Sequence, residues 1–215
     1  MRKLVYSSLL CFSSLCFAQD TSQQPTSDAA LQRLMEGNKR FTSGQPIHKN
    51  LGLEGLSALK EGQEPFAIIV GCSDSRVPPE IVFDQGLGDI FVVRVAGNVV
   101  GPIELDSVEF AVDKLHCPLV IVLGHENCGA VKATLLGQEN VPELDNIYPL
   151  IAPALKKCQA QKGDILMNAI KCNVKEGVGY LKSTPLIAKH IAANRVKIVG
   201  GYYDFDHGKV MIIPD

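Results

Sequence analysis

Short apolar runs alternate with longer amphipathic segments through most of the chain. Runs of strand length occupy residues 66–70, 90–94, 119–123 and 196–199, and a segment with helical spacing follows each of the first three. Continuous apolar runs of this length are typical of parallel strands buried on both faces. The pattern therefore predicts an α/β fold with a central, mostly parallel sheet flanked by helices.

A fifth strand is predicted at residues 209–213. It follows Asp206-His207-Gly208, a tight turn, so it should run antiparallel to its neighbour. The expected sheet thus has four parallel strands plus an antiparallel edge strand. The helical spacing predicts helices at residues 79–84, 103–116, 128–136, 145–180 and 185–194.

Two further helices are predicted ahead of the sheet. Asp28 is expected to cap a helix in which Leu31, Leu34 and Phe41 recur at helical spacing, and residues 52–59 indicate a second, shorter one. Together they would form an N-terminal helical arm.

The first residues have the pattern of a secretory signal peptide. Arg2 and Lys3 precede an apolar, serine-interrupted run, and small residues lead up to Ala18, after which we expect cleavage. The run is shorter than the roughly 20 residues that span a bilayer, which disfavours a retained membrane anchor. We therefore expect a signal peptide at 1–18, a polar linker at 19–27 and a single domain at 28–215, in a periplasmic or secreted protein without a membrane attachment after cleavage.

Composition narrows the classes of function. With 215 residues, 46% of them hydrophobic, the chain can bury one sizeable core. The formal net charge is −2 and no long run of Lys or Arg occurs, so nucleic acid is not an expected partner. A small neutral or anionic molecule fits better.

Cysteines bear on both redox state and metal binding. Cleavage would remove Cys11 and Cys16, which leaves five cysteines in an oxidising compartment. A bridge between Cys158 and Cys172 is one expectation. The alternative, that Cys117 and these two are buried thiols, stays open.

Two predicted strands run into segments that carry reactive side chains. The first is followed by Cys72, Asp74 and Arg76, and the third by His125 and Cys128. Ligands of an open parallel sheet bind outside the carboxyl ends of its strands. Two thiolates and an imidazole suit zinc and leave one tetrahedral position free, as in catalytic sites. Residues 72, 74 and 76 would point the same way in an extended segment, so Asp74 and Arg76 should lie beside the metal.

The motif C-x-D-x-R, followed some fifty residues later by H-x-x-C-G, resembles the β-class carbonic anhydrases. The resemblance continues through residues 77–80, 83–89, 91–94 and 96–98 and covers most of 28–215. It implies one zinc ion per subunit on Cys72, His125 and Cys128, and a catalytic pair of Asp74 and Arg76. It also implies a homodimer, or a dimer of dimers, with sites near the subunit interface and with the helical arm embracing the partner.

The resemblance extends to a substrate pocket and to two kinds of family member. Gln63 and Phe91 match substrate-pocket positions of the family, and Phe110 stands where open members often carry tyrosine. For a linear, apolar substrate, Phe91 and Phe110 would form pocket walls, and Gln63 and the Gly129 backbone N–H would meet its oxygens. Some members close when the aspartate, here Asp74, becomes a fourth zinc ligand. Their regulatory pocket uses a tryptophan, and this chain has none, which favours the open kind. No histidine stands out as a proton shuttle.

The expected function is the zinc-dependent, reversible hydration of carbon dioxide to bicarbonate and a proton, by a zinc-bound hydroxide that the Asp/Arg pair orients. Three alternatives remain at this point: a related zinc hydrolase acting on carbonyl sulfide or carbon disulfide, a non-catalytic structural zinc protein, and a thiol redox protein. The last would normally carry C-x-x-C, which is absent.

Overall fold

The computed structural model describes residues 24–137, 142–158 and 161–214. The predicted signal peptide and most of the predicted linker lie outside the described residues. Among the residues that are described, no helix combines the length and the apolar character needed to cross a membrane.

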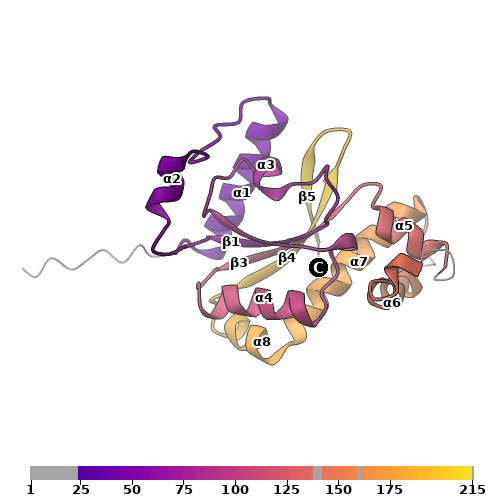
Figure 1. The fold of residues 1–215 in the computed structure, drawn as a ribbon. Helices are drawn as coiled ribbons and strands as arrows, with labels where there is room; N and C mark the ends of the chain where they lie inside the picture. Colours follow the sequence, from indigo (N-terminus) through magenta and orange to yellow (C-terminus); the bar gives the residue numbers. More distant parts are fainter. Residues whose placement is uncertain (1–23, 138–141, 159–160, 215) are drawn as a thin grey trace, which may run out of the picture.

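A five-stranded sheet forms the centre of the molecule (Figure 1). The strand order is β2-β1-β3-β4-β5, in which the first four strands run parallel and β5 pairs antiparallel with β4. The predicted α/β class and strand directions are confirmed. The strand bounds are Ala67–Gly71 for β1, Ile90–Arg94 for β2, Leu119–His125 for β3, Lys197–Asp204 for β4 and Lys209–Ile213 for β5.

The register of the sheet brings together the two segments that carry the reactive side chains. Gly71, the last residue of β1, pairs with Arg94 on one side and with Leu123 on the other. Cys72 therefore leaves the sheet level with the end of β3, where His125 is the last strand residue. Neighbouring parallel strands thus deliver both motifs to one edge.

Alternate residues of the central strands face two separate apolar clusters. Ile69 and Ile121 belong to one cluster, whereas Ile68 and Val120 belong to the other. Helices α1, α3, α5 and α6 cover the first face, α4 and α8 cover the second, and α7 contributes to both. In Figure 1, α1 and α3 lie above the sheet and α4 and α8 below it. The bounds are α1 Ser27–Thr42, α2 Leu53–Ala58, α3 Pro79–Val82, α4 Pro102–Asp113, α5 Gly129–Leu135, α6 Tyr148–Cys158, α7 Ile165–Ser183 and α8 Pro185–Ala192, with 3-10 turns η1 Ala96–Asn98 and η3 Pro142–Leu144.

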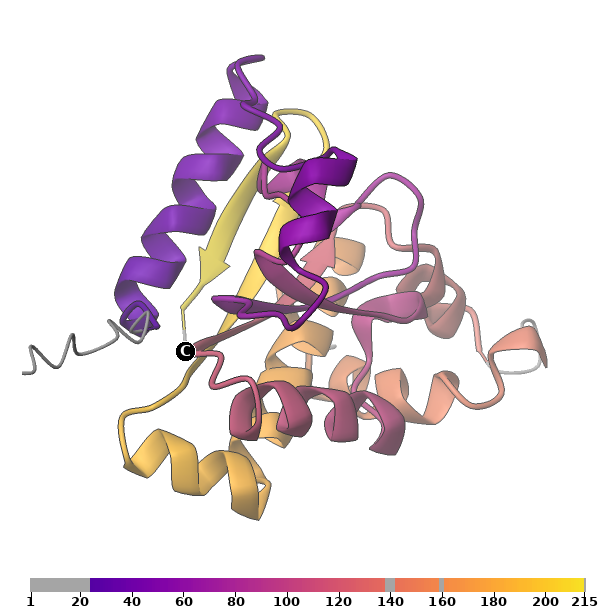
Figure 2. The same ribbon diagram turned by 60° about the vertical axis from the view of Figure 1, so that its left-hand side comes forward.

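Helix α1 packs on its own chain, beside the hairpin of β4 and β5 (Figure 2). Its buried Asn38 donates to the carbonyl oxygens of Val82 and Gly208 and accepts from the amide of Val210. Thr26, not Asp28, caps the helix, because the Thr26 hydroxyl accepts from the amide of Ala29. Asp28 lies in the first turn, where its charge favours the helix N-terminus.

The predicted helical stretch at 145–180 is wrong in one respect, since two helices occupy it. Helix α6 ends at Cys158, and α7 begins after Asp164, whose carboxylate caps it by accepting from the amide of Met167. Gly163 has a positive φ of 102° between them, which ends any continuous helix. The segment between Cys158 and Ile165 is polar apart from Ala160, and Gly163 and Asp164 are the sequence signals of the break.

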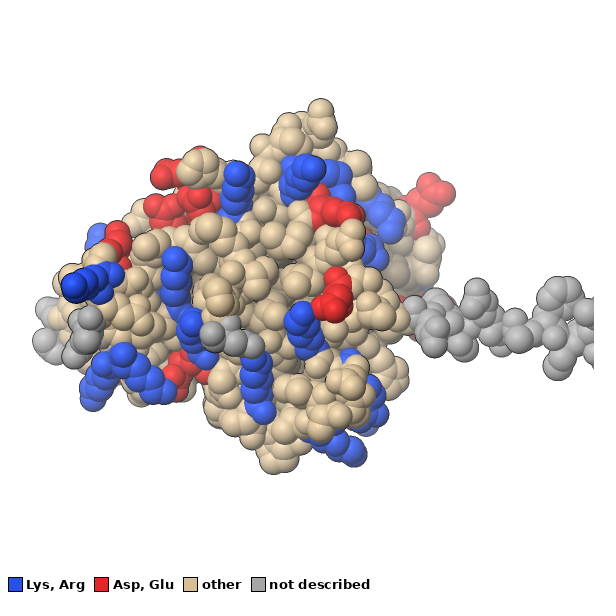
Figure 3. Space-filling view, turned by 180° about the vertical axis from the view of Figure 1, so that it is seen from behind, with Lys and Arg blue, Asp and Glu red and all other residues tan. Residues whose placement is uncertain are grey.

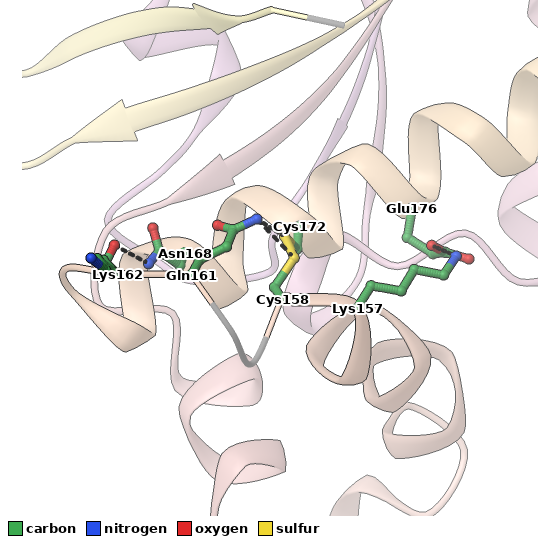
Figure 4. The surroundings of a disulfide bond; sticks show 7 residues. All are labelled: Lys157, Cys158, Gln161, Lys162, Asn168, Cys172 and Glu176. Atoms are coloured by element: carbon green, nitrogen blue, oxygen red, sulfur yellow. Dashed lines mark hydrogen bonds and ion pairs between the residues drawn. A yellow bond between two sulfur atoms is a disulfide. The ribbon is translucent and has the colours of Figure 1, made fainter.

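A disulfide between Cys158 and Cys172 fastens α6 to α7 (Figure 4). Lys157 and Glu176 form an ion pair between the same two helices. Of the two expectations for Cys158 and Cys172, the disulfide bridge is confirmed. Cys117 is a buried free thiol that donates to the carbonyl oxygen of Pro65.

Candidate metal centre and active site

Cys72, His125 and Cys128 converge on the side of the sheet that faces α5. Cys72 follows β1, His125 ends β3, and Cys128 is the N-cap residue of α5. Their sulfur and nitrogen atoms all lie within 4.8 Å of one another, and the three residues are 5% exposed or less. The spatial cluster expected from the two motifs is therefore present.

The imidazole of His125 has the orientation of a metal ligand. Its Nδ1 lies 2.8 Å from the carbonyl oxygen of Glu126, which can only accept, so Nδ1 carries the proton. The lone pair of Nε2 is then free, and this atom is buried without a hydrogen-bond partner in the described chain. A second ring nitrogen fixed by a backbone carbonyl is typical of metal-binding histidines.

The two thiols favour a soft cation between them. The Cys128 thiol hydrogen-bonds to Cys72 and, against the effect of burial, lowers the pKa of Cys72 to about 4. The same contact, with burial, raises the pKa of Cys128. The amide of Gly97 also donates to Cys72 Sγ at 3.3 Å, from a left-handed backbone with a φ of 72°. One thiolate is thus stabilised already, and a dication would displace the proton of the other. Two thiolates and one imidazole suit zinc.

Asp74 and Arg76 form a bidentate pair beside this cluster. Arg76 Nε donates to Asp74 Oδ1 at 2.9 Å, and Nη2 donates to Oδ2 at 2.7 Å. The fork is the main reason that the pKa of Asp74 falls to about 2. Asp74 Oδ2 lies 3.9 Å from His125 Nε2. An ionised carboxylate therefore stands next to the three ligand atoms, and the guanidinium engages both of its oxygens.

The predicted reason for this proximity was an extended segment, and that reason is wrong. The chain turns after Cys72: the Arg76 amide donates to Asp74 Oδ1, and the Val77 amide donates to the Asp74 carbonyl oxygen at 3.1 Å. An aspartate that accepts from the amide two residues later is a common turn motif. The turn, and not strand alternation, brings Arg76 onto Asp74.

Arg94 supports the loop that carries these residues, a role that was not predicted. It ends β2, and its guanidinium donates to the carbonyl oxygens of Cys72 at 2.8 Å and Asp74 at 2.6 Å. The register of β2 against β1 places Arg94 beside Gly71. Only the order of strands in the sheet reveals that contact, and the order cannot be read from the local sequence.

Gly129 lies at the site, with open space where a side chain would start. A Cβ built on it meets no atom within 4 Å, and the residue is exposed. A small molecule could therefore approach the Gly129 amide next to Cys128. This placement is compatible with the predicted contact to substrate, which stays a prediction.

The other predicted substrate residues lie away from the metal ligands of the same chain. Gln63 is exposed before β1, at the opposite end of that strand from Cys72. Phe91 packs against the cluster on the other face of the sheet, and Phe110 is 51% exposed on α4, which covers that face. The structure does not bring these three side chains into the site of their own chain.

Comparison with known proteins identifies the family to which the chain belongs. A protein-family model described as carbonic anhydrase matches residues 67–210. This range includes the three metal-binding candidates and the Asp74 and Arg76 pair. The chain belongs to the carbonic anhydrase family. It is similar to a carbonic anhydrase of Mycolicibacterium smegmatis, with 42% identity over 85% of this chain and 91% of the relative, and to carbonic anhydrase 2 of Mycobacterium tuberculosis, with 39% identity over 86% and 91%.

Solved structures place it in the β class of that family. The β-carbonic anhydrase CcaA is 27% identical with a TM-score of 0.65, covering 86% of this chain and 95% of that one. The β-carbonic anhydrase CafA of Aspergillus fumigatus is 29% identical with a TM-score of 0.63, covering 86% and 89%. The chain is thus an enzyme of the β-class carbonic anhydrase family, a lyase.

Proposed function

We propose that this β-class carbonic anhydrase catalyses the reversible hydration of carbon dioxide to bicarbonate and a proton, with one zinc ion on Cys72, His125 and Cys128. The observation that carries the proposal is the ionised Asp74 held beside three buried ligand atoms. A closed structural site would need a fourth strong ligand. Asp74 is the nearby candidate, and Arg76 occupies both of its oxygens.

Zinc, when bound, supplies hydroxide near neutral pH by lowering the pKa of water from 15.7 to about 7. Two thiolates and a neutral imidazole together cancel the charge of the zinc ion, which weakens its effect on the pKa of water. Another group of the protein must therefore assist, and it can do so by orienting the nucleophile. Asp74 is able to do this because an ionised carboxylate can only accept hydrogen bonds. Its Oδ2, which faces His125, would accept from the attacking hydroxyl group and turn a lone pair toward the substrate carbon.

Arg76 keeps Asp74 in this role. The Asp74 carboxylate accepts three hydrogen bonds from Arg76, two from the guanidinium and one from the backbone N–H. Rotation of the carboxylate toward the metal ligands would break the charge-assisted ones. The Arg76 side chain is 54% exposed, so the pair also lies where the released proton can reach solvent. For this chain to adopt the closed state, with Asp74 as the fourth metal ligand, the fork between Arg76 and Asp74 would have to open.

We propose further that two copies of the chain complete each pocket. Gln63, Phe91 and Phe110 lie away from the ligands of their own chain, and a second copy in a homodimer could supply them to a neighbouring site. Exposed apolar residues of and around α2, such as Leu53 and Leu56, offer a surface for such a contact. Dimers could pair again into a dimer of dimers.

We propose a periplasmic or secreted location. The basic and apolar start of the chain supports export. The Cys158–Cys172 disulfide supports an oxidising compartment, because such bridges are rare in reducing ones. On the face drawn in Figure 3, basic side chains are interspersed with acidic ones, which favours a small-molecule substrate over nucleic acid.

The decisive experiment is stopped-flow hydration of carbon dioxide with Arg76→Ala. We expect a fall in kcat/KM on the order of 100-fold, with one zinc per chain retained, because the ligands are untouched. Arg195→Ala, an exposed arginine outside the site, is the matched control and should keep full activity. Full activity of Arg76→Ala with zinc bound would contradict the role of the pair. A wild-type protein that binds zinc without hydrating carbon dioxide would indicate a structural site, and carbonyl sulfide and carbon disulfide should be assayed in parallel.

A further inference from the structure

Phe205 lies between two components of the site and belongs to neither motif. It follows β4 in the turn that leads to β5, and its side chain is half-buried. The guanidinium carbon of Arg76 sits 4.5 Å from the centre of its ring. The ring centroid of His125 is 5.5 Å away at an interplanar angle of 31°. One aromatic ring thus contacts both the catalytic pair and a metal ligand.

The surrounding backbone holds Phe205 in a defined place. Its amide donates to Glu126 Oε2 at 2.9 Å, and the Glu126 amide donates to the Tyr203 carbonyl oxygen. Tyr203 meets the ring edge-on, at an interplanar angle of 80°. Asp204 accepts from the Asp206 amide and pairs with His207, which closes the turn. The turn therefore fixes the backbone of Phe205, and its ring lies among the side chains of Tyr203, His125 and Arg76.

Arg76 needs such a surface because more than half of its side chain is exposed. An exposed ion pair gives up much of its energy to solvent screening and to side-chain entropy. An aromatic ring under the guanidinium restricts its rotamers and removes water from one face, while the donors in the guanidinium plane stay free for Asp74.

We propose that Phe205 is a positioning residue, whose ring holds the Arg76 guanidinium in the orientation that forks Asp74. The inference rests on the proposed role of the Asp74 and Arg76 pair. Phe205 touches neither substrate nor the reacting atoms in this assignment, and it acts through Arg76.

The test compares Phe205→Leu with Phe205→Trp. Leucine keeps apolar packing but has no π face, so we expect a two- to five-fold lower kcat, about what an exposed cation–π contact contributes. Zinc content should be unchanged and KM nearly so. Tryptophan, the strongest cation–π partner, should restore kcat. Equal damage by leucine and tryptophan would overturn the proposal, as would full activity of Phe205→Leu.

A double-mutant cycle separates positioning from packing. If Phe205 acts through Arg76, adding Phe205→Leu to Arg76→Ala should lower kcat no further. A full additional two- to five-fold loss in that background would contradict the inference. A readout independent of activity is the Nε–H signal of Arg76 in NMR, which should exchange with solvent faster in Phe205→Leu, and an unchanged exchange rate would also count against it.

Phe66→Leu is the matched control. Phe66 lies under Arg33 at 3.9 Å, and Arg33 pairs with Asp89 away from the site, so this variant should lose stability and keep kcat. The two proposals fail differently. Full activity of Arg76→Ala refutes the proposed function, whereas an inactive Arg76→Ala with a fully active Phe205→Leu refutes only the role of Phe205.

Discussion

Asp84 is a buried carboxylate that joins the N-terminal segment to the rest of the domain. It accepts from Arg40 Nε at 2.6 Å and from the amides of Ile47 and His48. Burial alone would raise its pKa, but these hydrogen bonds outweigh burial and lower it below the ordinary value. The charged form is therefore the one that the fold stabilises.

We predict that Asp84→Ala lowers the free energy of unfolding at pH 7 by about 3 kcal/mol, because the Arg40 guanidinium loses its buried partner. Since the folded-state pKa is depressed, the contribution of the charge is complete above about pH 4 and is lost as the pH falls through the folded-state value. Urea unfolding of wild type, Asp84→Ala and Asp84→Asn at pH 7 and pH 3 measures both effects. The difference in the free energy of unfolding between wild type and Asp84→Asn should shrink at the lower pH, and a constant difference would show that charge is not involved. Asp28→Asn, an exposed partner of Lys197, should change little at either pH.

Residues whose role follows from their own chemistry were predictable from the sequence. Cys72, His125 and Cys128 are metal-binding side chains at or just past the carboxyl ends of buried strands, and parallel strands end at one edge of the sheet. Arg94 and Phe205 were not predicted to support the site. Their roles depend on strand register and on the position of a turn, which bring together residues twenty or more positions apart.

At the scale of elements, α1 packs very closely against the C-terminal end of α3. This close contact decides whether adding a methyl group to α1 stabilises or destabilises the protein. A Cβ on Gly37 of α1 would lie 1.8 Å from the carbonyl oxygen of Phe83. Alanine is a better helix former than glycine by about 1 kcal/mol. Here, however, its Cβ would collide with a backbone atom, which cannot move aside as the end of a flexible side chain can. Helix α1 would have to move away from the core.

We therefore predict that Gly37→Ala destabilises the protein by about 1 to 3 kcal/mol. Gly179→Ala, in an exposed position of α7 where a Cβ meets nothing within 4 Å, should instead stabilise by about 0.5 to 1 kcal/mol. Chemical denaturation of both variants tests the pair. A stabilised Gly37→Ala would mean that α1 can shift at no cost.

The disulfide between α6 and α7 yields a second prediction at this scale. Cys158→Ser should lower the free energy of unfolding by about 3 kcal/mol, because the bridge closes a loop of 14 residues in the unfolded chain. Dithiothreitol should lower the melting temperature of wild type toward that of the variant and leave the variant unchanged. Equal sensitivity of both proteins to the reductant would contradict this assignment.

Most elements were predictable because their apolar periods are unambiguous, and β2 and β5 have the bounds that were expected. The break between α6 and α7 was not predicted, because the apolar spacing on either side of it is helical. The polar segment between them, with Gly163 followed by the capping residue Asp164, is the signal that could have shown it. The cap of α1 was also misplaced, because Thr26, Ser27 and Asp28 are all good capping residues.

At the scale of the whole molecule, the distance of Gln63 from Cys72 in one chain predicts complementation between inactive variants. If two copies share each pocket, as proposed above, Arg76→Ala and Gln63→Ala damage different parts of it. In a mixed dimer one site carries both changes and the other carries neither. Unfolding and refolding the two variants together, with zinc, should therefore restore about a quarter of wild-type activity, given random pairing in a symmetric dimer. Each variant refolded alone is the control. No recovery, with mixed dimers present by mass spectrometry, would show that Gln63 does not act across an interface.

The hydrogen bonds of Asn38 link the beginning of the chain to its end. Its amide group binds Gly208 and Val210, more than 160 residues away in the sequence. During synthesis α1 is made long before β5, and Asn38 has no partners in the β4–β5 hairpin until residues 208–210 have been made. The domain therefore cannot complete its packing before that point. A domain that stays open for most of its synthesis would suit the proposed passage across a membrane.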